Sequence, residues 1–183
     1  GKAKPGEFVD SPTSEVITKP IELIPISTFR EWRVTDKNSQ KLIQRVVVDQ
    51  SNEHWTEESI VNGMPVIRTK TLNFFVMLTS AIDELPFLVS FKKSGMYAGK
   101  VLSTHFQVSG MKGLPPARTT FVLGSEQRTS NNKTYYAPTM AAGRPTTEAE
   151  LAKAYAWYLQ LNQSAVKVAD EAGASEDGPS FNN

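Results

Sequence analysis

Hydrophobic and polar residues alternate over much of the chain before residue 145, and this pattern predicts β-strands. Short apolar runs, rich in β-branched and aromatic residues, are separated by polar turns. We expect a first strand, or a bent pair of strands, between Ile21 and Val34. Further strands are predicted at residues 42–49, 66–78, 86–91, 119–123 and 134–137.

Three polar segments between these runs carry turn signals. Residues 36–40, with the sequence Asp-Lys-Asn-Ser-Gln, separate the first two predicted strands. The pair Asn62-Gly63 is the strongest hairpin signal in the chain, although Pro65 soon after weakens it. A polar turn at residues 130–132 joins the last two predicted strands.

Two segments have the periodicity of helices. The first begins at Ser94 and runs to about Val108, but it contains Gly95 and Gly99, which lower helix propensity. The second runs from Thr147 to about Val168 and begins with a capping box formed with Glu150. We expect this second helix to pack on the protein through an apolar stripe made of Leu151, Ala154, Tyr155, Tyr158 and Leu159.

These elements predict a mainly β fold class with one internal helix and an added C-terminal helix. The 183 residues suit one domain with a single hydrophobic core. Residues 1–20 are expected to form a flexible arm, residues 21–145 the β domain and residues 146–169 the C-terminal helix. Residues 170–183 are expected to form a disordered acidic tail.

Several classes of protein are disfavoured by composition. The chain has no cysteine, which excludes disulfides and thiolate metal sites and fits a reducing cytoplasm. No apolar run approaches the roughly 18 residues of a membrane-spanning helix, and no signal peptide is recognisable. We therefore expect no membrane partner and a place in the cytoplasm of a host bacterial cell.

Two segments resemble catalytic or metal-binding motifs without satisfying them. Between Gly95 and Gly99 stand three residues, where a phosphate-binding P-loop needs four, and Val101 follows the lysine in place of Ser or Thr. His54 lies near three glutamates, but the other histidine, His105, is far away in sequence. We expect no enzyme activity, no cofactor and no metal, and we interpret the two glycines as positions where a helix packs close to the sheet.

Charge is distributed unevenly along the chain. Residues 88–144 contain eight basic residues and one acidic residue, Glu126, which gives this stretch a net charge of +7. Residues 170–183 contain four acidic residues and no basic one. A basic middle and an acidic end are typical of proteins that handle polyanions.

Single-stranded nucleic acid is bound by cations that neutralise phosphates and by aromatic rings that stack on bases. The basic stretch supplies both kinds of residue, and Trp32 stands between two arginines upstream. Tyr135 and Tyr136 are neighbours in a predicted strand, so one of them is expected to be exposed. The residues predicted to bind DNA are Trp32, Arg33, Lys92, Lys93, Tyr97, Lys100, Lys112, Arg118, Arg128, Lys133 and Tyr136. The alternative is that these rings fill the core while the lysines solubilise the surface.

The C-terminal segment carries its own signal. Glu176 and Asp177 precede Phe181, an apolar residue in an otherwise polar stretch. Such a segment is suited to bind a partner, the ring entering a pocket and the acids meeting basic residues around it. Alternatively, the segment merely solubilises the end of the chain.

This layout resembles the single-stranded DNA-binding proteins of tailed bacteriophages. The resemblance rests on the strand at residues 86–91, the helix from Ser94, the strand from Thr119 and the acidic tail with its aromatic residue. It implies an OB-fold, which is a five-stranded Greek-key barrel with a helix between its third and fourth strands. It also implies non-specific binding of single-stranded DNA in phage replication or recombination, with replication proteins as partners of the tail. In this chain two asparagines follow Phe181, a departure from the family pattern that bears on the role of the tail.

Two other functions compatible with the sequence are kept open. One is a phage structural or adaptor protein whose loops and Tyr155 and Tyr158 contact other proteins, with a homo-oligomer as one form. The other is a regulator that presents the basic surface to an acidic host enzyme.

Overall fold

The computed structural model describes residues 7–9, 16–17 and 21–173, with side chains described up to residue 163. A seven-stranded antiparallel sheet dominates this part of the chain. Its strands are β3 (Ile21–Asp36), β4 (Leu42–Val47), β5 (Glu58–Val61), β6 (Met64–Leu78), β7 (Phe87–Phe91), β8 (Thr119–Ser130) and β9 (Lys133–Pro145). The helical elements are η1 (Lys93–Gly95), α1 (Met96–Met111), η2 (Pro116–Arg118) and α2 (Glu148–Gly173). The mainly β fold with one internal and one C-terminal α-helix is therefore confirmed.

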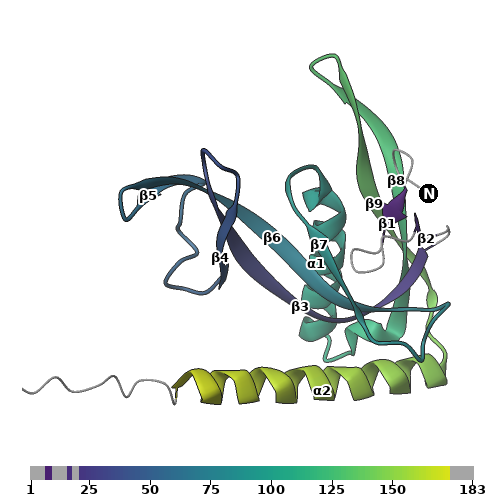
Figure 1. Cartoon of the computed structure of the whole chain (residues 1–183). Helices are drawn as coiled ribbons and strands as arrows, with labels where there is room; N and C mark the ends of the chain where they lie inside the picture. The colour runs from purple at the N-terminus through teal and green to yellow at the C-terminus, as the bar shows by residue number, and fades with distance from the viewer. Residues whose placement is uncertain (1–6, 10–15, 18–20, 174–183) are drawn as a thin grey trace, which may run out of the picture.

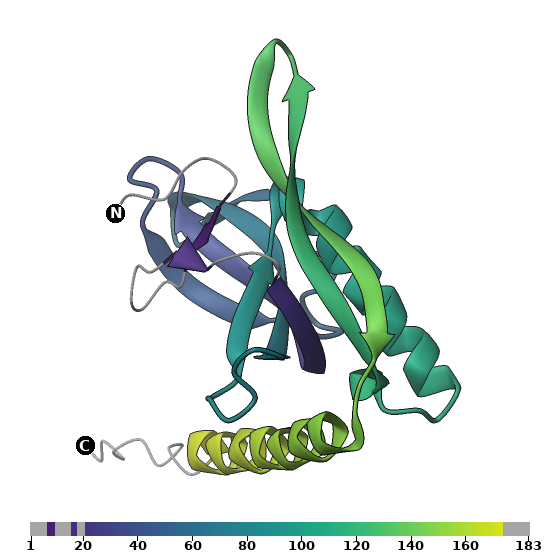
Figure 2. The same ribbon diagram turned by 90° about the vertical axis from the view of Figure 1, so that its right-hand side faces the viewer.

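The sheet is built around the long strand β3, which pairs with β4, β6 and β8. Its register shifts between Pro25 and Ser27, where proline cannot donate a backbone hydrogen bond, and again between Val34 and Thr35. Such irregularities let one strand bend and serve several neighbours. Figures 1 and 2 show β3 curving through the centre of the molecule.

The sheet has seven strands, where the OB-like prediction has five. The two additional strands, β4 and β5, lie in the connection between β3 and β6. The remaining five are ordered β7-β6-β3-β8-β9, and α1 follows the third of them in chain order. This arrangement is consistent with an OB-like barrel that is left open between β7 and β9.

Helix α1 fills that opening. A Cβ atom at Gly99 would lie 2.9 Å from Cβ of Phe91 on β7, and one at Gly95 would lie 3.2 Å from Cγ of Pro138 on β9. The two glycines therefore allow close packing of helix on sheet, as interpreted from the sequence. The core on this side of the sheet includes Phe74 and Leu102, both fully buried.

A second apolar cluster lies where α2 packs on the other side of the sheet. Ala154 is buried there, and Leu151, Trp157 and Leu161 pack around it. The predicted packing stripe is partly wrong, because Tyr155, Tyr158 and Leu159 remain 58%, 41% and 42% exposed. The helix face that packs against the sheet carries Leu151, Ala154, Trp157 and Leu161. It is therefore rotated around the helix axis relative to the predicted stripe.

The N-terminal segment also differs from the prediction. Within residues 1–20, β1 (Phe8–Val9) and β2 (Val16–Ile17) form a two-stranded sheet, and Phe8 packs against the main core. Burial of an aromatic ring offsets part of the entropy lost by ordering these residues.

The predicted capping box at the start of α2 is confirmed. The backbone N–H of Thr147 donates to Oε2 of Glu150 at 2.8 Å, and the N–H of Glu150 donates to Oγ1 of Thr147 at 3.2 Å. Both terminal guanidinium nitrogens of Arg144 also donate to the Glu150 carboxylate, at 2.7 and 2.9 Å. These hydrogen bonds, first of all that from Arg144, lower the pKa of Glu150 to about 2.

We expect replacement of Glu150 by glutamine to lower the melting temperature in a pH-dependent way. Because the folded-state pKa is depressed, the stabilisation is fully present above the ordinary value of 4.5 and is lost as pH falls towards about 2. The difference in melting temperature between wild type and Glu150→Gln should thus be largest above pH 4.5 and shrink in acid. Thermal unfolding followed by circular dichroism across this range measures it. A difference that stays constant down to the lowest pH contradicts this assignment.

Candidate nucleic-acid interface

Strands β8 and β9 extend well beyond the body of the protein as a projecting hairpin (Figure 1). We call residues 127–136 the β8–β9 arm. Asn131 and Asn132, with φ angles of 50° and 60°, form the two-residue turn at its tip. Tyr135 and Tyr136 point to opposite faces, and both are exposed, at 37% and 43%. The sequence interpretation expected one of them to be exposed; the projection of the arm beyond the core explains why both are.

Helix α1 begins beside the base of this arm. Figures 1 and 2 both show its N-terminal end next to β8 and β9, in agreement with the close approach of Gly95 to Pro138. Tyr97, in the first turn of α1, is 64% exposed. The guanidinium carbon of Arg128 lies 5.9 Å from the centre of the Tyr97 ring. A residue of the helix and a residue of the arm are thereby joined by a cation–π contact.

Exposed lysines lie on the elements that make this contact. Lys92 and Lys93 lie where β7 passes into α1, and Lys100 lies one turn after Tyr97. Lys133 lies at the tip of the arm, where it pairs with Ser130. Arg128 pairs with Tyr135 two positions closer to the body of the protein. We call the whole group the arm site: Lys92, Lys93, Tyr97, Lys100, Arg128, Lys133, Tyr135 and Tyr136.

Glu126 is the one acidic residue between residues 88 and 144, and it forms an ion pair with Arg128. This carboxylate therefore holds Arg128 in place while neutralising its charge. The four lysines of the arm site have no ion pair within the part of the chain that the structure describes. Their charges are available to an anionic ligand.

Two of the predicted DNA-binding residues lie at the opposite end of α1. Lys112 caps the C-terminus of the helix, and Arg118 ends η2. A helix of 16 residues is about 24 Å long, so neither belongs to the arm site. The prediction grouped Lys112 and Arg118 with the other basic residues because net charge was counted along the chain. The sequence alone does not show that α1 separates the residues at its two ends.

The stacking role predicted for Trp32 does not fit its position. The ring is 6% exposed, and its Nε1 donates to the backbone oxygen of Asn52 at 3.1 Å. Trp32 and Arg33 belong to the part of β3 that pairs with β4, away from α1. The adjacent arginines suggested a surface ring, but the loop that contains Asn52 covers it.

An aromatic and cationic cluster that the sequence interpretation missed surrounds Trp32. Trp55 lies 6.5 Å from it, the guanidinium of Arg68 lies 4.3 Å from the Trp55 ring, and the ammonium of Lys70 lies 5.2 Å from the Trp32 ring. The sequence does carry a signal for this cluster. Arg68 and Lys70 are two positions apart in a predicted strand, so both side chains lie on the same face of the sheet. These contacts stabilise the second projecting part of the molecule, the β4–β5 arm, made of β4, β5 and the adjoining ends of β3 and β6 (Figure 1).

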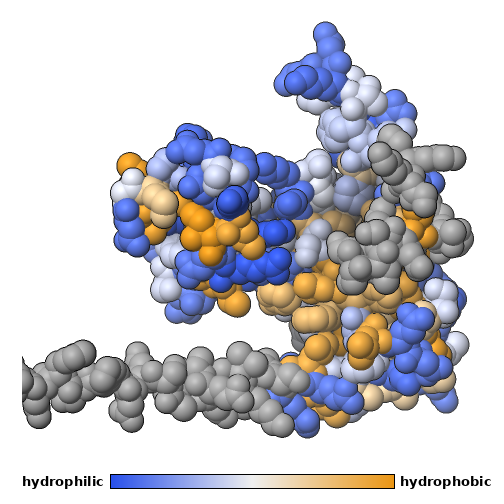
Figure 3. Space-filling model, viewed as in Figure 1, coloured by the Kyte–Doolittle hydropathy of each residue, from blue (hydrophilic) through white to orange (hydrophobic). Residues whose placement is uncertain are grey.

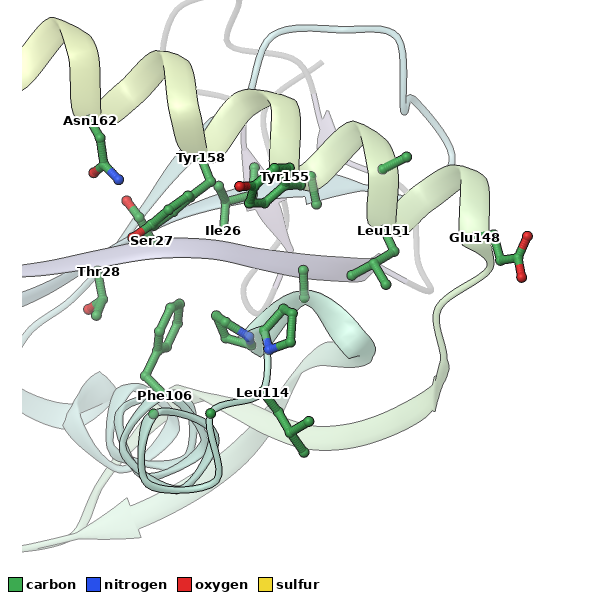
Figure 4. A pocket seen from close by; sticks show the side chains of 17 residues that line it. Ile26, Ser27, Thr28, Phe106, Leu114, Glu148, Leu151, Tyr155, Tyr158 and Asn162 are labelled. Atoms are coloured by element: carbon green, nitrogen blue, oxygen red, sulfur yellow. The ribbon is translucent and has the colours of Figure 1, made fainter.

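An apolar groove of about 890 Å³ lies on the far side of the molecule from the arm site, between the C-terminal part of α1 and α2. Figure 4 shows Phe106 and Leu114 facing Tyr155 and Tyr158 across it. The two tyrosine rings stack on each other at 6.4 Å. The other principal lining residues are Ile26, Pro115, Pro116, Ala117 and Leu151.

Two findings on the described residues concern metal sites and membrane-spanning helices. No group of three or more histidines and carboxylates is close enough to hold a metal ion there. Neither described α-helix is long and apolar enough to cross a membrane. The predicted tail residues Glu176, Asp177 and Phe181 lie outside the described residues.

The sequence matches the model of one protein family along almost its whole length, residues 1–167. That family is the Pam3 phage gp34-like proteins. The chain belongs to this family. Membership in the gp34-like family confirms the prediction that this is a phage protein. Neither a curated protein nor a solved structure matches the chain.

Proposed function

We propose that this gp34-like protein binds single-stranded DNA without sequence specificity, in phage replication or recombination. The observation that carries the proposal is the arm site, which combines the Tyr97–Arg128 contact, exposed tyrosines on both faces of the arm, and four exposed lysines on the arm and at the start of α1. The cations are suited to phosphates and the rings to bases. Stacking on an aromatic ring contributes roughly 1–3 kcal/mol per base and tolerates any base.

The position of the arm site in the fold supports the same function. In the five-strand order described above, the β8–β9 arm connects the fourth and fifth strands. The β4–β5 arm is inserted between the first and second strands. In OB-folds these two connections flank the surface that binds oligonucleotides.

Exposed rings favour single strands over duplexes. Bases within a duplex are stacked on each other and offer no free face to a tyrosine, whereas unpaired bases do. Four of the cations of the arm site are lysines, which bind phosphates as point charges, and stacking on a tyrosine ring tolerates any base. We therefore expect little preference among sequences.

The direct test is a titration of the intact protein with a fluorescent oligo-dT of about 20 nucleotides, long enough for one OB-sized site. Affinity should fall about tenfold to a hundredfold between about 50 mM and about 200 mM salt, because bound lysines release counterions. A duplex of equal length is the control and should bind much more weakly. Equal affinity for the duplex, or affinity that does not change with salt, refutes the proposal.

A second candidate function is favoured by a separate observation. The β4–β5 arm exposes apolar side chains, namely those of Leu42, Ile43, Val47, Ile60 and Met64, with exposures of 44–74%. Figure 3 shows orange, hydrophobic surface on that arm. Exposed apolar surface marks protein–protein contact sites when it is concentrated on one part of a molecule. A phage structural or adaptor role predicts a stable assembly and no affinity for DNA. Light scattering after gel filtration, combined with the titration above, distinguishes the two functions.

A further inference from the structure

The groove between α1 and α2 follows a stripe of mainly apolar residues on α2, and this stripe is longer than the groove. Its members stand at alternating spacings of four and three residues, namely Leu151, Tyr155, Tyr158, Asn162, Ala165 and Ala169. The first four of these residues line the groove, where the two tyrosines are 58% and 41% exposed. A stripe with this spacing over about five turns is typical of a helix that packs lengthwise against another helix.

The stripe continues into the second half of α2, which runs out from beneath the centre of the sheet (Figure 1). The sequence is apolar at positions 165, 166, 168 and 169 and polar at positions 163, 164, 167 and 170, so this half is amphipathic as well. A helical segment of about ten residues has little stability of its own in water. Packing of its apolar side against another helix stabilises it.

The stripe is complementary in size to a second copy of itself. Its large side chains belong to the first half of α2, and its small side chains belong to the second half. Two antiparallel copies centred near residue 160 place the following side chains opposite one another: Leu151 with Ala169, Tyr155 with Ala165, and Tyr158 with Asn162. Large side chains facing small ones fill the space between helices, whereas a parallel pair would place tyrosine on tyrosine and alanine on alanine.

The charges at one end of the groove favour the same arrangement. Arg118 lies at the start of α2, since the N–H of Thr146 donates to its backbone oxygen at 3.0 Å, and Lys112 directly precedes the lining loop after α1. Both cations are exposed, and they outnumber the acid Glu148 that lines this end. In the antiparallel pair, the C-terminal end of α2 from the second copy arrives here with Asp170 and the negative end of its helix dipole.

Only a second molecule can bring that end of α2 to these cations. The helix has 26 residues and is therefore about 39 Å long, so its C-terminal end lies far from Arg118 of the same molecule.

We propose that two copies of this chain form a dimer through antiparallel packing of α2, the second half of each helix covering the groove of the other copy. The groove lies on the far side of the molecule from the arm site, so the dimer stands or falls independently of DNA binding.

Light scattering after gel filtration of the intact chain, over a range of concentrations, is the first test. The expected mass at high concentration is twice that of the 20.2 kDa chain, falling towards one chain on dilution. A mass of one chain at every concentration, or an assembly larger than two chains, overturns the proposal.

Two variants with the same change in charge show whether the stripe makes the contact. Ala165→Lys/Ala169→Lys places two charges against the large side chains of the second copy and should raise the dissociation constant of the dimer by on the order of tenfold or more. Gln163→Lys/Ser164→Lys adds the same charge on the opposite face of α2 and should change the constant less than about threefold. Equal effects, or a dimer that persists in both variants, would mean that another surface such as the β4–β5 arm joins the copies. Circular dichroism confirms that both variants keep the fold of the wild type.

The orientation of the two helices is measured with nitroxide labels. Because the sequence has no cysteine, Gln163→Cys and Glu171→Cys each provide a single attachment site. In an antiparallel pair centred near residue 160, the two labels are separated along the helix axis by about 9 Å at position 163 and by about 33 Å at position 171. Pulsed electron paramagnetic resonance should therefore give a clearly longer distance at position 171. Equal distances at the two positions indicate parallel helices and contradict the proposal.

Discussion

Replacement of Lys92 and Lys100 by alanine is expected to lower the affinity for single-stranded DNA about tenfold to thirtyfold at about 0.1 M salt. Each lysine that contacts a phosphate of a single strand contributes about 0.7 to the slope of log affinity against log salt. The slope should therefore become shallower by about 1.4, and the loss of affinity should be greatest at low salt. Fluorescence titrations at several salt concentrations measure both quantities.

The chain provides a control with the same change in charge. Lys112→Ala/Arg118→Ala removes two positive charges from the other end of α1, about 24 Å away. It should change the affinity for DNA less than threefold at the same salt, since charges beyond about 10 Å are screened there. If this control weakens binding as much as Lys92→Ala/Lys100→Ala, the DNA is not held at the arm site and overall charge governs binding.

Replacement of Gly99 by alanine should destabilise the protein by about 1–3 kcal/mol. The new Cβ would lie 2.9 Å from Cβ of Phe91 and 3.0 Å from Cδ1 of Leu72, so α1 must move away from the sheet. The higher helix propensity of alanine, worth up to about 1 kcal/mol, offsets only part of this cost. Chemical denaturation followed by circular dichroism gives the difference in free energy of unfolding.

Gly110, in the last turn of the same helix, serves as the comparison. A Cβ atom there would meet nothing within 4 Å, so Gly110→Ala should be neutral or stabilising by up to about 1 kcal/mol. Similar stability changes at the two glycines would mean that α1 does not fill the opening between β7 and β9 as tightly as the structure indicates.

Elements set by local sequence could be predicted without the structure. The Asn62-Gly63 turn has φ angles of 50° and 78°, and Val61 pairs with Met64 across it, as the hairpin signal required. The capping box at Thr147 is equally local, because its hydrogen bonds join residues three positions apart. The order of strand, helix and strand around α1 followed from hydrophobic periodicity alone.

Features that depend on distant contacts could not be predicted. The arm site needs Arg128 beside Tyr97, and the chain between them forms a helix, a loop and a strand. The burial of Trp32 depends on a loop that reaches back from Asn52. Strands β8 and β9 were also predicted too short, because beyond the core they are held by pairing with each other and their exposed residues show no apolar alternation.

The pairing of β3 with β8 has a consequence for how the chain folds. Ile21 pairs with Leu123, about 100 residues later, so the central strand cannot complete its hydrogen bonds until most of the chain is available. Synthesis of the roughly 100 residues between Ile21 and Leu123 takes roughly 5–20 s at about 5–20 residues per second. Throughout this time the backbone groups of β3 that later pair with β8 have no partner strand. Closing such a long loop also slows refolding to the millisecond-to-second range typical of domains dominated by non-local strand pairing. During that interval the unpaired edge of β3 is a site at which a nascent chain can pair with another copy.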